Sequence, residues 1–194
     1  PDNTADWAWV QLMLHHARKK VGIVLDQGAL FRGGREKSIR EGIVKDDLLE
    51  AVVLLPEKLF YNTSAPGVIL IFNKEKPQER RRKVLFVNAG DEYIKHPEVR
   101  RLNMLSDANI EKIVNAYREF NDIPGFARVV TIDEIERNDY NLNVTIYVTP
   151  QTETEEINLE RELQELLEVN RLAEETMTKA MQYIQQIIQV NKQG

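Results

Sequence analysis

The stretch Leu49–Phe72, LEAVVLLPEKLFYNTSAPGVILIF, decides the fold of this sequence. It contains two apolar runs of strand length, and Pro56 ends the first of them because proline cannot donate a hydrogen bond to a sheet. The connection between the runs ends in a polar turn at residues 62–67 and contains no pattern of helical length. We therefore predict two antiparallel neighbouring strands, at residues 49–55 and 68–72.

Upstream of this stretch, helical and extended patterns alternate. Apolar residues at steps of three and four predict an amphipathic helix over residues 6–20. The short apolar run Val21–Leu25 is typical of a strand that is buried on both faces of a parallel sheet. The two glycines within Arg32–Arg35 then predict a loop, followed by a helix over residues 36–45.

The alternation continues downstream. Ser106 can cap a helix over residues 106–120, whose apolar stripe consists of Ile110, Ile113, Val114 and Tyr117. Around it we predict strands at residues 83–87, 126–132 and 144–148, and a short helix at residues 133–137. Such an alternation of strands and helices is typical of a layered α/β fold.

The pattern changes after Pro150. Residues 157–191 contain no glycine or proline and predict one long, coiled-coil-like helix. Its seam alternates steps of four and three residues and consists of Leu159, Leu163, Leu166, Asn170, Ala173, Met177, Ala180, Ile184 and Ile187. We predict two domains, residues 1–149 and 150–194, with the helix packed on another chain. The alternative is a helix that folds back along its own domain.

Composition narrows the class of protein. The net charge of −5 excludes a uniformly basic DNA-binding surface but allows a local one. The absence of cysteine excludes disulfides, thiolate catalysis and zinc fingers. No apolar run approaches the roughly 18 to 20 residues that cross a bilayer, so we expect a cytoplasmic protein without membrane contact. His15, His16 and His96 are not spaced as metal ligands, and no metal site is expected. The start at Pro1 suggests a piece cut from a longer protein.

Four segments together resemble the M subunit of type I restriction-modification systems, the subunit that methylates adenine in DNA. One of them is Val24–Gly34, which is similar to the family's Leu-Pro-Asn-Gly-Val-Leu-Phe-Arg-Gly-Gly stretch. The others are Ala5–Val10, Leu48–Thr63, and Gly125–Val130 with the following Asn138–Asn143. The resemblance extends to about Val148. It implies the C-terminal half of a Rossmann-like, S-adenosylmethionine-dependent methyltransferase domain with a mixed sheet, followed by a long C-terminal helix.

The sequence departs from the family at two places. Asp26 stands where the family commonly has proline, and Thr145–Val148 stands where Pro-Arg-Tyr-Val is usual. The family's glycine-rich cofactor loop and its Asn-Pro-Pro-Phe catalytic loop both precede the region matched here, and neither occurs in these residues. We therefore assign no catalytic or cofactor-binding residue and expect this piece alone to be inactive. The longer parent is expected to be an adenine-specific DNA methyltransferase.

The resemblance also implies which residues could meet DNA. The target adenine must leave the duplex stack, and flipped bases are held on aromatic faces. Phe60 and Tyr61 lie in the turn between the two antiparallel strands, where related enzymes present an aromatic side chain to the base, although one of two adjacent aromatics often packs inward. Phe60 is the first choice for stacking. Arg32, Arg35, Lys37 and Arg40 are the predicted phosphate contacts, and a solvated loop and helix face is the alternative.

The partners follow from the same resemblance. DNA is the expected substrate, S-adenosylmethionine the cofactor of the parent, and the S (specificity) and R (restriction) subunits the protein partners. Self-association of the terminal helix is a further expectation. Two alternatives stay open, namely a helical interaction module without catalysis and a part of a fused restriction-methylation enzyme.

Overall fold

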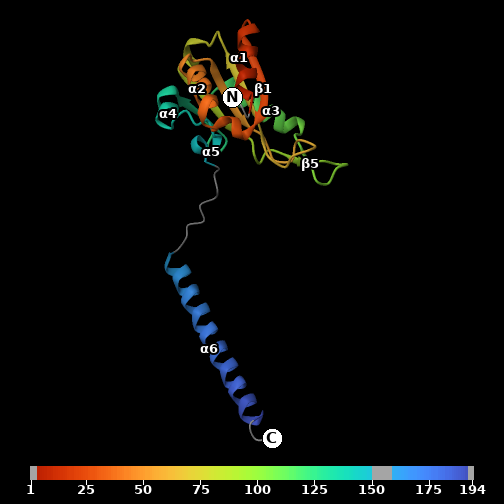
Figure 1. Cartoon of the computed structure of the whole chain (residues 1–194), viewed down its shortest axis with the longest axis vertical. Helices are drawn as coiled ribbons and strands as arrows, with labels where there is room; N and C mark the ends of the chain where they lie inside the picture. The colour runs from red at the N-terminus through yellow and green to blue at the C-terminus, as the bar shows by residue number, and fades with distance from the viewer. Residues whose placement is uncertain (1–3, 150–158, 192–194) are drawn as a thin grey trace. The chain divides into compact units, whose positions relative to one another are not determined.

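The computed structural model describes residues 4–149 and 159–191, which belong to two compact units, Pro1–Gln151 and Thr152–Gly194. Unit 1 is built on a five-stranded sheet with the strand order β1-β3-β2-β4-β7 (Figure 1). The strands are β1 (Lys20–Asp26), β2 (Leu49–Leu54), β3 (Gly67–Asn73), β4 (Lys83–Asn88) and β7 (Ala127–Thr131). β2 pairs antiparallel with β3, as predicted, and parallel with β4. The other two pairings are antiparallel, so the sheet is mixed.

Helices cover both faces of the sheet because side chains of successive strand residues point to opposite faces. Val52 and Leu54 of β2 join the core beneath five elements, namely α1 (Asp6–His16), η1 (Gln27–Leu30), α2 (Gly34–Lys45), α4 (Ile132–Arg137) and α5 (Val144–Tyr147). Ala51 and Val53 join a second core beneath α3 (Asp107–Glu119). The result is the three-layered α/β architecture that the alternation of elements predicts.

The remaining elements of unit 1 are short. One is the 3-10 turn η2 (Gln78–Arg80), which precedes β4. The other two, β5 (Ile94–Lys95) and β6 (Asn103–Met104), pair with each other as a two-stranded hairpin outside the main sheet. Figure 1 shows the β5 segment extending away from the sheet.

Three local predictions are wrong. The first helix ends at His16, not residue 20, because β1 already begins at Lys20. β1 is not buried on both faces: it pairs with β3 at the edge of the described sheet, and its Val24 is 52% exposed. Residues 144–147 form the helical turn α5, not a strand, because Val144 and Tyr147, one turn apart, both enter the core.

The helix α3 confirms its predicted start. The Ser106 hydroxyl accepts from the Asn109 N–H, and the Asn109 side chain accepts from the Ser106 N–H, which makes a capping box. Ile113 is buried as predicted, but Ile110 is 44% exposed, and Ala116 takes the inner position.

The described part of unit 2 is the helix α6 (Leu159–Asn191). The predicted seam residues whose side chains are described are exposed, among them Leu163, Leu166, Met177 and Ile184 at 51–67% exposure. The side chains of Leu159 and Ile187 lie outside the described residues. Within the described part of the chain, no helix combines the length and apolar character needed to cross a membrane.

Candidate functional site

The loop between β2 and β3 stands at the carboxyl end of β2 and closes on itself through its backbone. The N–H of Leu55 donates to the Gly67 carbonyl at 2.9 Å, and the N–H of Lys58 donates to the Ser64 carbonyl at 3.3 Å. Lys58 adopts a left-handed conformation with φ 59°, which turns the chain sharply. Phe60 and Tyr61 therefore lie in a defined loop, not in the core.

Phe60 is 37% exposed, and its ring packs over the backbone of Gly67. A Cβ at Gly67 would lie 2.6 Å from Phe60 Cε2, so only glycine permits this approach. The ring borders a largely apolar cavity of about 350 Å³ together with Val24, Leu25 and Pro66. The carboxylate residues Asp6 and Asp26 lie at its rim. An aromatic ring that is supported from one side and borders an apolar cavity is suited to stacking on a planar group.

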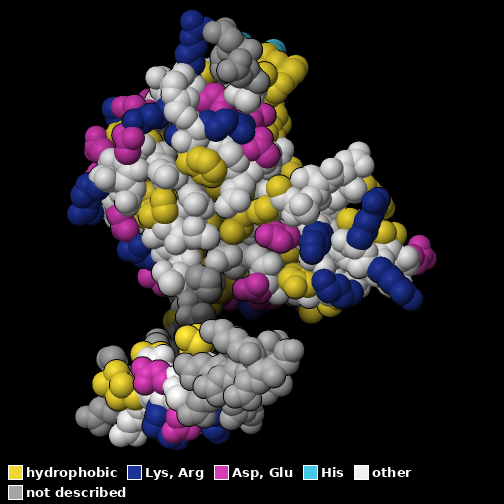
Figure 2. All heavy atoms as spheres, turned by 60° about the horizontal axis from the view of Figure 1, so that its bottom comes forward, with side chains coloured by type: hydrophobic (Ala, Val, Ile, Leu, Met, Phe, Trp, Pro, Cys, Tyr) yellow, Lys and Arg dark blue, Asp and Glu magenta, His cyan; other side chains and the backbone are white. Residues whose placement is uncertain are grey.

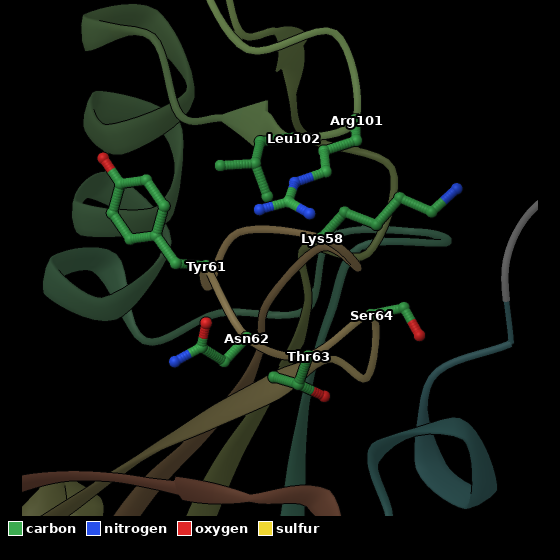
Figure 3. A pocket seen from close by; sticks show the side chains of 7 residues that line it. All are labelled: Lys58, Tyr61, Asn62, Thr63, Ser64, Arg101 and Leu102. Atoms are coloured by element: carbon green, nitrogen blue, oxygen red, sulfur yellow. The ribbon is translucent and has the colours of Figure 1, made fainter.

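Tyr61 is 70% exposed and borders a neighbouring hollow of about 470 Å³ (Figure 3). Its other lining residues are Lys58, Asn62, Thr63, Ser64, Arg101 and Leu102. Thr63 lines both this hollow and the Phe60 cavity, so the two adjoin at the same loop. The hollow is rich in hydroxyl, amide and cationic groups, whereas the Phe60 cavity is apolar.

A third cavity, of about 510 Å³, opens where the parallel strands β2 and β4 end. It is lined by Leu54 at the end of β2 and the adjoining Leu55, by Asn88 at the end of β4, and by Lys58 and Lys95 from the segments beyond the strands. The carboxyl ends of parallel strands are where open α/β sheets bind ligands. All three cavities therefore meet around the loop that carries Phe60.

The prediction that Arg40 contacts DNA is wrong. Arg40 is 1% exposed, and its guanidinium donates to the carbonyl oxygens of Tyr140, Ala29 and Arg32 at 2.8–3.2 Å. Burial lowers the pKa of this side chain, and the carbonyl oxygens satisfy its donors. Arg40 therefore links α2 to η1 and to the residues before α5. Its guanidinium is too buried to contact a phosphate.

The other three predicted cations are exposed to different degrees. Arg32 is held by the carboxylates of Asp6, Asp26 and Glu36, the latter two at 2.9 and 2.8 Å. Burial alone would raise the pKa of Asp26, but the hydrogen bond and charge of Arg32 outweigh it and hold that pKa below its usual value. Lys37 is paired with Asp139 at 2.6 Å. Arg35 is exposed on α2. The structure thus neutralises Arg32 and Lys37 and does not gather the four into one patch.

Sequence reasoning missed the hairpin of residues 91–103. It carries Lys95, Arg100 and Arg101, and it is attached to the Phe60 loop by Asn103. The signal available in the sequence was the pair of adjacent arginines a few residues after Pro97, in a segment with no strong helix or strand pattern. Its position beside the loop depends on tertiary contacts that no local pattern encodes.

The start of α2 does not offer a site for an anionic group of a cofactor. The Gly33–Gly34 loop opens α2, but Glu36, in the first turn of that helix, is 3% exposed and paired with Arg32. A carboxylate already supplies the negative charge that a helix start favours, so an anionic cofactor group has no place there. Among residues 4–149 and 159–191, no three His, Asp or Glu side chains lie close enough to hold a metal ion.

Comparison with known protein families and structures identifies the class of protein to which this chain belongs. The family model described as N-6 DNA Methylase matches residues 1–156, and the chain belongs to this family. More particularly, it is 58% identical over 188 residues to the type I restriction enzyme MjaVII methylase subunit of Methanocaldococcus jannaschii. It is 62% identical over 177 residues to the MjaVIII methylase subunit of the same organism. These alignments cover 97% and 91% of this chain, but 33% and 30% of the relatives.

The fold is similar to a solved structure of the same kind. The methyltransferase subunit of a type I restriction-modification system from Streptococcus thermophilus superposes with a TM-score of 0.71 at 37% identity. The match covers 76% of this chain and 31% of that one. The family and fold expected from the sequence segments are thereby confirmed, and the chain spans about a third of the length of the curated relatives it matches.

Proposed function

We propose that this chain supplies the base-capturing and subunit-contacting part of an M subunit that methylates N6 of adenine in DNA. The observation that carries the proposal is Phe60, an exposed aromatic ring fixed over Gly67 beside an apolar cavity, in a member of the N-6 DNA methylase family. The names of the most similar relatives, methylase subunits of type I restriction enzymes, support the same reaction.

In this proposal Phe60 acts by binding, not by proton transfer. An adenine that has left the duplex lies in the apolar cavity with one face on the Phe60 ring. Such stacking contributes about 1–3 kcal/mol per base. S-adenosylmethionine supplies the methyl group in the whole enzyme, and residues outside this chain hold it. Tyr61, being more exposed, is the second candidate for contact with the displaced nucleotide.

The partners belong to the proposal as well. The exposed apolar seam of α6, Leu163 to Ile184 in its described part, is suited to helical packing against the S subunit, and the R subunit joins the same assembly. Residues 1–149 then form the methyltransferase part, and residues 150–194 the subunit-association part. The reaction takes place in the cytoplasm, where the DNA substrate lies.

The test is Phe60→Ala in the full-length polypeptide that carries this chain. We expect capture of the flipped adenine, followed by the fluorescence of 2-aminopurine at the target position, to weaken about 5- to 150-fold, the equivalent of the stacking energy. Binding of S-adenosylmethionine, measured by calorimetry, should change much less, because Phe60 belongs to the base side of the pocket.

The matched control is Phe31→Ala, which removes a similarly exposed phenyl ring that lines none of the three cavities described above. It should leave base capture unchanged. An equal loss of base capture and cofactor binding in Phe60→Ala would defeat the assignment of Phe60.

A further inference from the structure

The hairpin of residues 91–103 projects beside the Phe60 loop and presents three cations, Lys95, Arg100 and Arg101. Lys58, in the loop itself, is a fourth. Figure 2 shows Lys and Arg side chains gathered on a lobe that extends from the body of unit 1, where Figure 1 places the β5 segment. We call Lys58, Lys95, Arg100 and Arg101 the basic hairpin surface.

This surface has a defined position relative to the loop. The Asn103 N–H donates to the Lys58 carbonyl at 2.9 Å, and the Asn103 side-chain amide donates to the Glu57 carbonyl at 2.8 Å. Asn103 itself is 5% exposed, and the adjacent Leu102 is 4% exposed. The tip is shaped by His96, whose Nδ1 accepts from the N–H groups of two following residues at 3.1–3.2 Å. The hairpin is thus fastened to the base-capturing loop.

The four cations are exposed, and none forms an ion pair with a carboxylate in the described part of the chain. The nearby acidic side chains do not neutralise them: Glu92 is paired with Lys112, while Glu57, Asp91 and Glu98 are solvent-exposed and lie beyond ion-pair distance of these cations. Arg32 and Lys37, by contrast, are already paired. Exposed cations without acidic partners are the ones that can release counterions from a phosphate backbone.

The hollow beneath Arg101 adds neutral hydrogen-bonding groups. Figure 3 shows the Arg101 guanidinium reaching from the hairpin over the loop that carries Asn62, Thr63 and Ser64. Arginine, amide and hydroxyl groups are the usual contacts of DNA phosphate oxygens. Thr63 also lines the Phe60 cavity, so a phosphate in the hollow would adjoin a base on Phe60.

We propose that the basic hairpin surface binds the phosphate backbone of duplex DNA next to the adenine that Phe60 captures. The inference rests on the proposed function, because it takes DNA as the partner and Phe60 as the base contact. It moves the predicted phosphate contacts from the α2 region, where Arg40 is buried and Arg32 and Lys37 are neutralised, to the hairpin that is bonded to the loop through Asn103. The net charge of −5 does not oppose it, since positive charge is concentrated locally.

The test compares two double variants of the full-length M subunit, each in complex with its S subunit. Arg100→Gln with Arg101→Gln removes two charges from the surface. Duplex binding is measured by fluorescence anisotropy over a series of salt concentrations. If each arginine contacts one phosphate, the slope of log K against log salt should become shallower by about 1.8, or roughly 0.9 per contact. Affinity should fall equally for duplexes with and without the recognition sequence, because phosphate contacts carry no sequence information.

The control, Arg81→Gln with Arg118→Gln, removes two exposed arginine charges near the amino ends of β2 and β4, at the other end of the sheet. It should leave the salt slope unchanged. Lys58→Gln, alone, should reduce the slope by about 0.9 and gives an independent measurement in the loop. Thermal unfolding should match the parent in all variants, because each altered side chain is exposed.

Three results would overturn the inference. If the parent binds and methylates DNA but the Arg100/Arg101 variant has an unchanged salt slope, this surface does not bind DNA. The proposed function would then still stand. An equal loss in the control would show a general effect of net charge. Loss of S-subunit binding with intact DNA binding would show that the surface docks a protein. An unaltered M–S complex that binds no duplex DNA would instead reject the proposed function itself.

Discussion

Glu50 is the most strongly constrained carboxylate of unit 1. Its side chain is fully buried, and it accepts from Tyr117 Oη at 2.5 Å and from Asn73 Nδ2 at 3.0 Å. Lys20 Nζ lies 3.3 Å away and Arg80 3.5 Å away. Burial alone would raise the pKa of Glu50, but the hydrogen bonds from Tyr117 and Asn73 and the charge of Lys20 outweigh it and hold the pKa below its usual value. Glu50 therefore links β1, β2, β3 and α3. It is an ionised side chain whose carboxylate oxygens have hydrogen-bond partners.

This environment predicts a specific pH dependence of stability. A carboxylate with a lowered folded-state pKa stabilises the fold above its unfolded pKa, near 4.5, and this contribution is lost as the pH falls through the lower folded-state value. Glu50→Gln should lower the free energy of unfolding at pH 7 by about 1.5–3 kcal/mol, the contribution of hydrogen bonds to a charged group. The difference between the two proteins should shrink below about pH 4.5. Urea unfolding followed by tryptophan fluorescence, to which the buried Trp7 contributes, measures both effects.

Glu75→Gln is the control for this experiment, because Glu75 forms an ion pair with Lys19 in which both side chains are more than half exposed. It should change stability by less than about 1 kcal/mol. A difference between Glu50→Gln and the parent that stays constant from pH 7 to pH 3 would contradict the ionised state of Glu50.

The environments of some single residues could be predicted from the sequence, and those of others could not. The resemblance predicted that Phe60 and Tyr61 lie in the turn between the two strands, with the alternative that one of them packs inward, and the structure leaves both exposed. The burial of Arg40 could not be foreseen, because its partner Tyr140 lies 100 residues further along the chain. The same holds for Glu50, a charged residue within an apolar run whose partners lie on three other elements.

Elements were predictable where a local signal decides them. The antiparallel β2 and β3 followed from a connection too short for a crossover helix, and the start of α3 followed from Ser106. β1 and α5 were mistaken because short apolar segments have no periodicity that separates a buried strand from an edge strand or a helical turn. Their packing partners decide them, namely β3 for β1 and the core around Phe86 for α5.

The long helix α6 allows a prediction at the level of one element. Apolar side chains also occupy positions flanking the seam, including Leu167, Val169 and Met181, all exposed. A stripe of this width suits a bundle of helices. Asn170, on the seam, should lower stability while fixing the number of partners. Asn170→Leu should therefore raise the thermal midpoint of the helical assembly and broaden its distribution of oligomers in sedimentation experiments.

Gln164→Leu is the matched control, since it introduces the same side chain one residue beyond the seam position Leu163. It should raise neither the midpoint nor the number of oligomeric species to the same extent. If the two variants behave alike, Asn170 has no special place in the helical interface.

At the scale of the whole molecule, the two units differ in the contacts that can stabilise them. Unit 1, Pro1–Gln151, has two hydrophobic cores, one on each side of its sheet. Unit 2, by contrast, exposes large apolar side chains along α6. Single isolated helices gain little from propensity alone, and their stability in proteins comes from packing of an apolar face. Unit 1 should therefore fold without unit 2, whereas unit 2 depends on a helical partner.

The last prediction tests this division in the full-length M subunit, by ending the chain after Gln151. Loss of the α6 seam should abolish co-purification with the S subunit, because the apolar stripe that we propose as the interface is gone. The thermal unfolding of the remaining α/β part should be preserved, since the residues of both its cores lie before the cut. Point variants that place charge on the stripe, such as Leu166→Glu with Met177→Glu, should reproduce the loss without shortening the chain, because charged side chains cannot be buried in a helical interface without partners. Undiminished association of the shortened subunit with S would assign the contact to unit 1 and leave α6 without a role in assembly.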